Sequence, residues 1–190
     1  MNYPSFTSDY ALWCMIAFFL SEVVLSRMRR SSTMTQDRNS LRVLYVTIGL
    51  SITAGSMFYA YGIGNYQLAY LWRSTFTIGF LALGAVIRWV AIRQLGKHFT
   101  VGVEIQPDHE LQQSGLYKWV RHPSYTGLML EFIGLSLYFS NWMSFIFILL
   151  PITLALVYRI RVEERALLER FGKEYEEYSA NTARLIPGIW

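Results

Sequence analysis

The 190-residue sequence has few charged residues and almost no cysteine. Asp, Glu, Lys and Arg make up 16% of it, whereas a soluble domain averages about 25%. The single cysteine, Cys14, cannot form a disulfide within the chain, which excludes a small secreted module held together by disulfides. Hydrophobic residues make up 53% and the mean hydropathy is +0.27, so the composition also excludes a disordered chain.

Charge is missing most completely from two long segments. No charged residue occurs from Val43 to Trp72 or from Phe132 to Tyr158. Each run exceeds the ~20 residues that an α-helix needs to cross a hydrocarbon layer of ~30 Å. Neither run alternates apolar and polar residues as a transmembrane β-barrel does. The sequence therefore predicts an all-α, polytopic membrane protein and excludes a soluble globular domain.

We expect one membrane domain over residues 1–190, with about five transmembrane helices. Three of these spans lie within residues 1–95, and spans four and five form a tight helical hairpin that turns at Asn141 and Trp142. Helical periodicity continues beyond span five and predicts cytoplasmic C-terminal helices. The expected spans cover residues 10–26, 43–63, 75–92, 125–139 and 145–158, and the expected cytoplasmic helices cover residues 159–171 and 174–180, separated by Gly172.

Basic residues are distributed unevenly between the expected loops. The chain has 17 basic and 13 acidic residues, and the loops after spans one and three and the C-terminal tail carry nearly all of the basic ones. Because basic loops face the cytoplasm, this asymmetry predicts an outside N-terminus and a cytoplasmic C-terminus. The same rule accounts for the net charge of +4 without a nucleic-acid partner. We expect the membrane to be a bacterial inner membrane.

The tripeptide Arg121-His122-Pro123 stands just before span four. Proline suits the first turn of a helix because its missing N–H would be unpaired there in any case. Arg121 and His122 would then lie beside a helix N-terminus, which attracts anionic groups. The alternative is an interfacial anchor made of Lys118, Trp119, Arg121 and His122, and the residues alone leave both interpretations open.

Two carboxylates and an arginine follow span five. Glu163 and Glu164 could accept hydrogen bonds from sugar hydroxyls. The alternative is a solvated helix face on which neighbouring arginines offset their charge. Arg159 stands at the expected membrane boundary, where it can bind a carboxylate or phosphate, or extend to the lipid headgroups.

Glu131 stands about two turns into the expected span four. An acidic side chain inside a membrane is costly and suggests a functional role by default. The alternative is a structural pair with Arg88 of span three.

Several chemistries are absent from the sequence. The three histidines, His98, His109 and His122, do not have the spacing of metal ligands, and one cysteine cannot build a thiolate zinc site, so we expect no metal. The sequence also lacks a phosphate-binding P-loop, a dinucleotide-binding glycine motif and the G-x-S-x-G turn of hydrolases.

The order and spacing of motifs over roughly residues 96–190 resemble the isoprenylcysteine carboxyl methyltransferase family, which has relatives among phospholipid methyltransferases. The motifs are residues 108–111 (DHEL), 114–117 (SGLY), 120–127 (VRHPSYTG), Arg159, Glu163-Glu164, 171–178 (FGKEYEEY) and 184–187 (RLIP).

This resemblance implies an integral-membrane methyltransferase that uses S-adenosylmethionine and releases S-adenosylhomocysteine. It makes residues 96–190 the catalytic half. The residues that it assigns to the cofactor pocket are His109, Leu111, Tyr117, Val120, Arg121, His122, Tyr125, Glu163, Glu164, Tyr178, Arg184, Leu185 and Pro187. It assigns a catalytic role to Arg159, which would orient the acceptor. At Glu131 the sequence departs from the family's pattern, which is usually not acidic there, so the identity of the acceptor stays open. A phenol or enol acceptor would need further help, for which Glu131 and His122 are the catalytic candidates.

The resemblance also implies a lipophilic acceptor that enters sideways from the membrane lipids. The acceptor is an isoprenylcysteine-type carboxylate or the acid or hydroxyl group of a small lipid. A carboxylate is already ionised and needs alignment rather than a base, and alignment can supply ~7–11 kcal/mol. The alternatives are an NADPH-dependent reductase of the sterol type and a non-catalytic membrane scaffold or transporter.

Overall fold

The structure is a computed structural model that describes residues 38–96 and 111–190, together with positions 13, 16 and 20. Most of the expected first span, and His109 of the expected cofactor pocket, lie outside these residues. The described chain is helical, with two isolated β-bridges. Its helices are α2 (Arg38–Ala60), α3 (Tyr70–Leu95), η3 (Gly115–Lys118), α4 (Pro123–Tyr138), α5 (Trp142–Phe171) and α6 (Lys173–Asn181).

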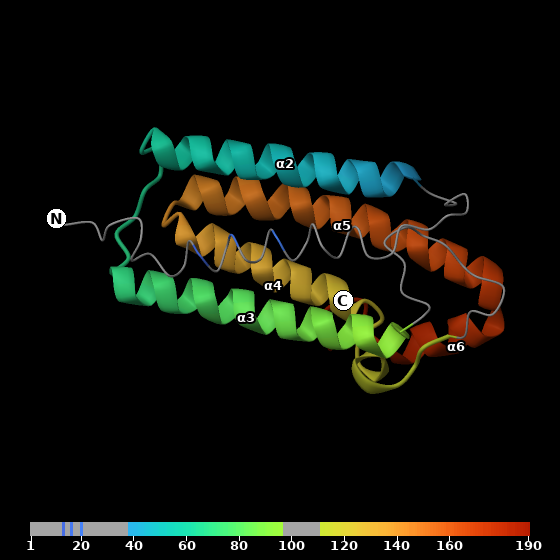
Figure 1. The fold of residues 1–190 in the computed structure, drawn as a ribbon. Helices are drawn as coiled ribbons and strands as arrows, with labels where there is room; N and C mark the ends of the chain where they lie inside the picture. The colour runs from blue at the N-terminus through green and yellow to red at the C-terminus, as the bar shows by residue number, and fades with distance from the viewer. Residues whose placement is uncertain (1–12, 14–15, 17–19, 21–37, 97–110) are drawn as a thin grey trace.

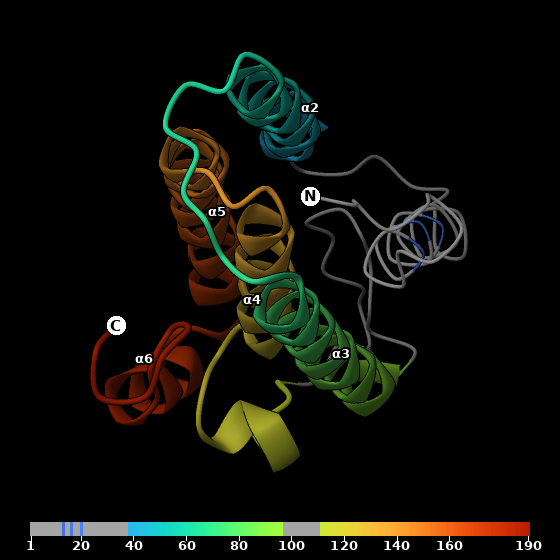
Figure 2. The ribbon, with the colours of Figure 1, turned by 90° about the vertical axis from the view of Figure 1, so that its left-hand side faces the viewer.

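The four long helices lie side by side as a bundle (Figure 1). Viewed from its end, the bundle has α4 between α5 and α3, and α2 lies beside α5 (Figure 2). The apolar core lies where these helices meet, and its fully buried side chains include Phe132 of α4 and Ile148, Ile152 and Leu156 of α5. Large apolar side chains on the outer faces of α2, α3 and α5 are exposed, as expected for helices in contact with lipid.

Three helices are long and apolar enough to cross a membrane, and they correspond to the expected spans two, three and five. The helix α2 begins at Arg38 rather than at residue 43, and α3 begins at Tyr70 rather than at residue 75. The helix α2 extends past the charge-free stretch, because arginine side chains near a helix end can reach the lipid headgroups. The expected span four is α4, which has 16 residues.

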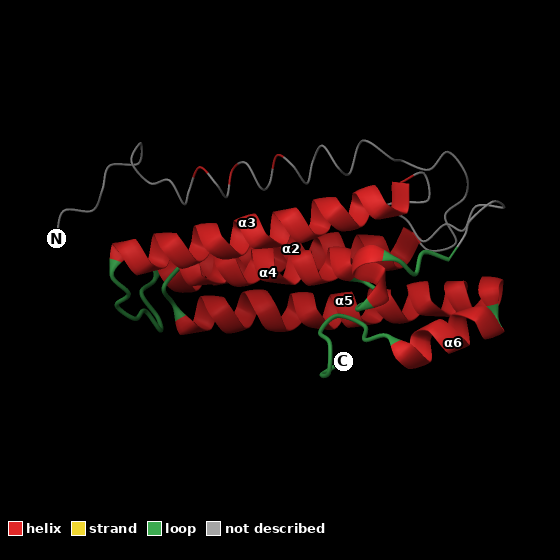
Figure 3. Cartoon of the chain, turned by 90° about the horizontal axis from the view of Figure 1, so that it is seen from below, coloured by secondary structure: helices red, strands yellow, loops and turns green. Residues whose placement is uncertain are grey.

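The last long helix continues beyond the expected span five, as the sequence predicts. The helix α5 runs for 30 residues and includes both the expected span five and its extension. It ends at Gly172, whose φ of 52° is a conformation that glycine adopts easily, and α6 follows at once. Figure 3 shows the end of α5 and α6 projecting past the other helices, so the charged helical segment that follows the expected span five lies beyond the bundle.

Asn141 fixes the short connection between α4 and α5. Its side-chain oxygen accepts a hydrogen bond from the Ser144 N–H at 2.8 Å, which caps α5. Its amide donates to the Ile63 carbonyl at 2.9 Å, and the Ser144 hydroxyl donates to the Gly55 carbonyl at 2.6 Å. The turn between α4 and α5 is therefore tied to the end of α2, and this holds α5 against α2.

The helices α3 and α4 approach each other most closely where glycines face one another. A Cβ atom placed on Gly84 would lie 2.5 Å from the Gly127 carbonyl oxygen, and one on Gly127 would lie 2.6 Å from the Gly84 carbonyl oxygen. Larger side chains at either position would push the helices apart. This contact sets the distance between α3 and α4, the helix that begins directly after His122.

Replacing Gly84 with alanine should therefore destabilise the protein by about 1–3 kcal/mol, the usual cost of overpacking. Thermal unfolding in lipid nanodiscs measures the change. Gly79 on the same helix is the matched control, because a Cβ atom there meets nothing within 4 Å. Gly79→Ala should be neutral or slightly stabilising. Equal shifts for both variants would show that the close approach does not matter.

Candidate functional site

The tripeptide Arg121-His122-Pro123 begins α4, with Pro123 in the first turn and His122 as the residue before it. The backbone here is paired with the C-terminal tail. The Arg121 N–H donates to the Ala183 carbonyl at 2.8 Å, and the His122 N–H donates to the Arg184 carbonyl at 3.1 Å. The tail therefore lies across the N-terminal end of α4.

The Glu164 carboxylate joins α5 to the segment just before α4 and to the tail. Its Oε1 atom accepts a hydrogen bond from Arg121 Nε at 2.9 Å, and its Oε2 atom accepts one from Arg184 Nε at 2.8 Å. The side chains of Glu164 and Arg121 are 12% and 8% exposed. Both partners come from outside α5, so the alternative of a solvated helix face is wrong for this residue.

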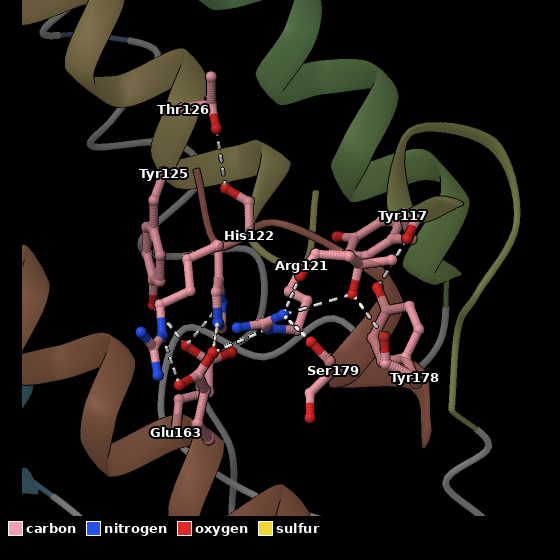
Figure 4. A network of polar contacts seen from close by, with 11 residues as sticks. Tyr117, Arg121, His122, Tyr125, Thr126, Glu163, Tyr178 and Ser179 are labelled. Atoms are coloured by element: carbon pink, nitrogen blue, oxygen red, sulfur yellow. Dashed lines mark hydrogen bonds and ion pairs between the residues drawn. The ribbon is translucent and has the colours of Figure 1, made fainter. Parts of the chain in front are cut away.

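The Arg121 guanidinium extends this connection to the end of α6. It donates to the carbonyl oxygens of Ser179, at 2.7 Å, and of Thr182. Figure 4 shows this side chain reaching from α4 toward Ser179. Arg121 is therefore surrounded by acceptors and is not a side chain that reaches out to lipid headgroups.

A second chain of hydrogen bonds passes through Tyr125. Its hydroxyl donates to Glu163 Oε2 at 2.9 Å and accepts from Arg159 Nε at 2.8 Å. The Nη1 atom of Arg159 donates to Ser40 Oγ of α2 at 2.9 Å. Arg159 is only 3% exposed, so it is held in the protein interior and does not extend to the headgroups.

The His122 ring lies between the two carboxylates. Its Nδ1 atom is 3.9 Å from Glu163 Oε2 and its Nε2 atom is 3.5 Å from Glu164 Oε1. The ring also stacks on Tyr125, with the ring centres 5.6 Å apart. The residue is 5% exposed. His122 thus connects the chain of contacts through Glu164 with the chain through Glu163 (Figure 4).

Three buried tyrosines border the same region. Burial raises the pKa of Tyr178 to about 12. Burial also raises the pKa values of Tyr117 and Tyr175, and the carboxylates of Glu163 and Glu164 respectively add to the rise. All three phenols therefore stay neutral at physiological pH and keep their protons for hydrogen bonds, as Tyr178 does toward the Tyr117 carbonyl at 2.7 Å.

The chain is similar in sequence to a known family of membrane enzymes. A family model described as the isoprenylcysteine carboxyl methyltransferase (ICMT) family matches residues 77–169. The protein-S-isoprenylcysteine O-methyltransferase of Schizosaccharomyces pombe is 35% identical over 117 residues, which are 60% of this chain and 50% of that protein. The enzyme of the same name from Saccharomyces cerevisiae is 37% identical over 109 residues, covering 56% of this chain and 46% of that protein.

A solved structure shares the fold. The structure of the eukaryotic intramembrane Ras methyltransferase ICMT superposes with a TM-score of 0.65 at 26% identity, and the match covers 94% of this chain and 65% of that chain. Over residues 77–169 the chain is therefore similar to the isoprenylcysteine carboxyl methyltransferase family. It spans about half the length of the two curated yeast relatives.

Most of the described residues that the resemblance assigned to a cofactor pocket lie together. The tail carries Leu185, whose carbonyl accepts a hydrogen bond from Thr126 of α4 at 2.8 Å. Val120 is buried and forms a bridge with Ala183. Leu111 and Pro187 have apolar side chains and take no part in the polar network, and Pro187 is exposed.

Glu131 lies apart from this cluster, deeper in the bundle. It comes nine residues after His122, or ~13 Å along the helix axis. It is 2% exposed, and its Oε2 atom is 3.7 Å from Arg88 Nη1. The structural pair with Arg88 that the sequence left open is therefore present. A catalytic role for Glu131 stays a prediction.

Sequence reasoning missed three residues that complete the network. Ser40 contacts Arg159 across 119 positions of sequence, and no local pattern marks it. Ser179 and Thr182 contribute backbone carbonyls to Arg121, which any residue could supply. Only the fold brings these groups to the site.

Replacing Glu164 with glutamine should lower stability by about 1–3 kcal/mol, because Arg121 and Arg184 lose the charge on their shared acceptor. Thermal unfolding without added ligand measures this loss. Glu169→Gln is the control, since Glu169 is exposed on the same helix and should be nearly neutral. If the two variants unfold at the same temperature, Glu164 does not hold the tail.

Proposed function

We propose that the protein is an S-adenosylmethionine-dependent methyltransferase that acts on a lipophilic acceptor at the cytoplasmic face of a membrane. The observation that carries this proposal is the buried cluster of Arg121, His122 and Glu164 at one end of the membrane bundle, closed by the C-terminal tail. The relatives named above support the reaction class, since they carry the name of isoprenylcysteine O-methyltransferases.

The side chains at the site fit this cofactor. Within the described part of the chain, His122 Nε2 and Tyr175 Oη are buried and make no hydrogen bond. S-adenosylmethionine consists of a nucleoside joined to an amino acid, and its polar groups can form hydrogen bonds with both atoms. Carboxylates suit its ammonium and ribose hydroxyls, and arginines suit its carboxylate. The residues that we assign to the pocket are His109, Leu111, Tyr117, Val120, Arg121, His122, Tyr125, Glu163, Glu164, Tyr178, Arg184, Leu185 and Pro187.

When bound, S-adenosylmethionine supplies a methyl group made electrophilic by its sulfonium. The protein has to hold the acceptor in line with that group and to keep water away. Arg159 is suited to hold an acceptor carboxylate, because hydrogen bonds to Tyr125 and Ser40 fix its guanidinium in advance. An ionised carboxylate needs no base. A hydroxyl acceptor would need one, and His122 and Glu131 are the candidates.

The acceptor is an isoprenylcysteine-type carboxylate or the acid or hydroxyl of a small lipid. We propose that it reaches Arg159 from the surrounding membrane lipids, and that Glu131 influences which acceptors are accepted. The positive-inside distribution supports a cytoplasmic C-terminus and an outside N-terminus. The relatives named above are eukaryotic, so they lend no support to a bacterial inner membrane, which stays a prediction.

We also propose that residues 96–190 form the catalytic half and residues 1–95 its membrane support within one domain. The hydrogen bond from Arg159 to Ser40 shows one way in which the first part can serve the second. The relatives named above favour methyl transfer over an NADPH-dependent reductase or a non-catalytic scaffold.

Methyl transfer is tested with protein in lipid nanodiscs, S-adenosylmethionine carrying a labelled methyl group, and extracted lipids or a prenylcysteine acid as acceptors. We expect label in the acceptor fraction. We also expect S-adenosylhomocysteine, and not NADPH, to raise the unfolding temperature, since a ligand at 100 times its Kd adds ~2.7 kcal/mol. Stabilisation by NADPH alone would contradict the proposal.

Two substitutions should separate cofactor binding from acceptor orientation. His122→Ala should weaken binding of S-adenosylhomocysteine by roughly tenfold or more, because a buried hydrogen-bonding group is lost. Arg159→Ala should leave that affinity nearly unchanged and lower kcat by ~100-fold or more. Arg161→Ala is the control, since Arg161 is exposed on the same helix. An equal loss of affinity in the His122 and Arg159 variants would show that the two roles are wrongly assigned.

A further inference from the structure

The segment around the Arg121-His122-Pro123 motif faces two different environments. Arg121 and His122 are buried in the polar network, but Trp119 is 64% exposed. In the tail, Ile186 and Ile189 are also exposed, at 50% and 77%. We call Trp119, Ile186 and Ile189 the interfacial patch. These large apolar side chains have no role in the proposed methyl-transfer site.

The backbone brings the two parts of this patch into one unit. The Ala183 N–H donates to the Trp119 carbonyl at 3.3 Å. The N–H groups of Leu185 and Ile186 both donate to the Trp190 carbonyl, at 2.9 and 3.1 Å, and close the last residues into a compact turn. The patch is therefore carried by a fixed structure and not by a loose end.

The position of this turn along the bundle is set by α4. Its Leu185 carbonyl is bonded to Thr126, in the first turn of α4. In Figures 1 and 3 the chain leaves α6 and returns toward the bundle, so that its end lies level with the beginning of α4. The helix α6 lies farther out. The turn is thus at the depth where the long apolar helices begin or end.

A basic side chain lies close to each of the two tryptophan rings of this region, Trp119 and Trp190. The Nζ atom of Lys118 lies 5.9 Å from the centre of the Trp119 ring, and the Cζ atom of Arg184 lies 5.1 Å from the centre of the Trp190 ring. Tryptophan and basic residues are enriched at membrane–water interfaces, where the ring meets the headgroups and the cation meets lipid phosphates.

We propose that the interfacial patch inserts into the headgroup region of the lipid bilayer and anchors the C-terminal tail to the membrane surface. The end of the chain lies level with the beginning of α4, and the exposed apolar faces of α2, α3 and α5 contact lipid in any membrane-spanning arrangement. Three large apolar side chains on two segments that are bonded together suit a lipid surface, in which each can insert separately. The anchor does not depend on the proposed methyl transfer.

Spin labels in nanodiscs test the depth of the patch. Cys14→Ser removes the single native cysteine, and Ile189→Cys then places a nitroxide on the patch. Leu154→Cys is the control for the lipid face, because Leu154 is 61% exposed on α5. Glu177→Cys on the exposed side of α6 is the control for water. Collision with oxygen reports lipid, and collision with a water-soluble nickel complex reports water.

We expect the label at position 189 to collide mainly with oxygen, as at position 154, whereas position 177 collides mainly with the nickel complex. Trp119→Cys should give the same result as position 189. Collision mainly with nickel at position 189 would overturn the proposal. Low accessibility to both reagents would also overturn it, because a second copy or another protein would then cover the patch. These measurements require no cofactor and no acceptor, so they stand apart from any failure to detect methyl transfer.

Discussion

The site depends on one carboxylate that is shared by two arginines. Glu164 of α5 accepts hydrogen bonds from Arg121, just before α4, and from Arg184 in the tail. It is therefore the side chain that links these three segments. A side chain that is 12% exposed keeps its charge only because both oxygens accept bonds from cations. The position of the tail follows from this arrangement, and the tail in turn supplies the carbonyls that pair with the backbone of residues 121 and 122.

The membrane explains why such a polar cluster lies at one end of the bundle. Charged groups are costly in the hydrocarbon layer, so the ones that the interior contains are paired, as Glu131 is with Arg88. At the end of α4, peptide groups and charged side chains can instead form a network that includes water-accessible residues such as Arg184. Arg159 reaches into this network from α5, and Ser40 of α2 holds its guanidinium.

Local sequence patterns predicted the helices but not most of the side-chain contacts between them. Pro123 predicted the start of α4, and Gly172 predicted the end of α5. The helical spacing of apolar residues from Val162 onward predicted that span five continues to Phe171. The pair between Glu131 and Arg88 could be anticipated because few charges occur inside neighbouring spans. The bond between Arg159 and Ser40 could not, because it depends on how α2 packs against α5 and joins residues 119 positions apart.

The sequence also left two interpretations of residues 118–122 open, and in the structure each of them describes part of this segment. The helix η3 and the extended link after it turn successive side chains in different directions. Trp119 therefore faces outward while Arg121 and His122 face the carboxylates of α5. Because one short segment carries both groups, the position of Trp119 relative to Arg121 and His122 is set by the chain. The backbone bonds of residues 119, 121 and 122 to residues 183 and 184 hold this segment in place, so the distance between the exposed ring and the polar network does not depend on the motion of a free loop.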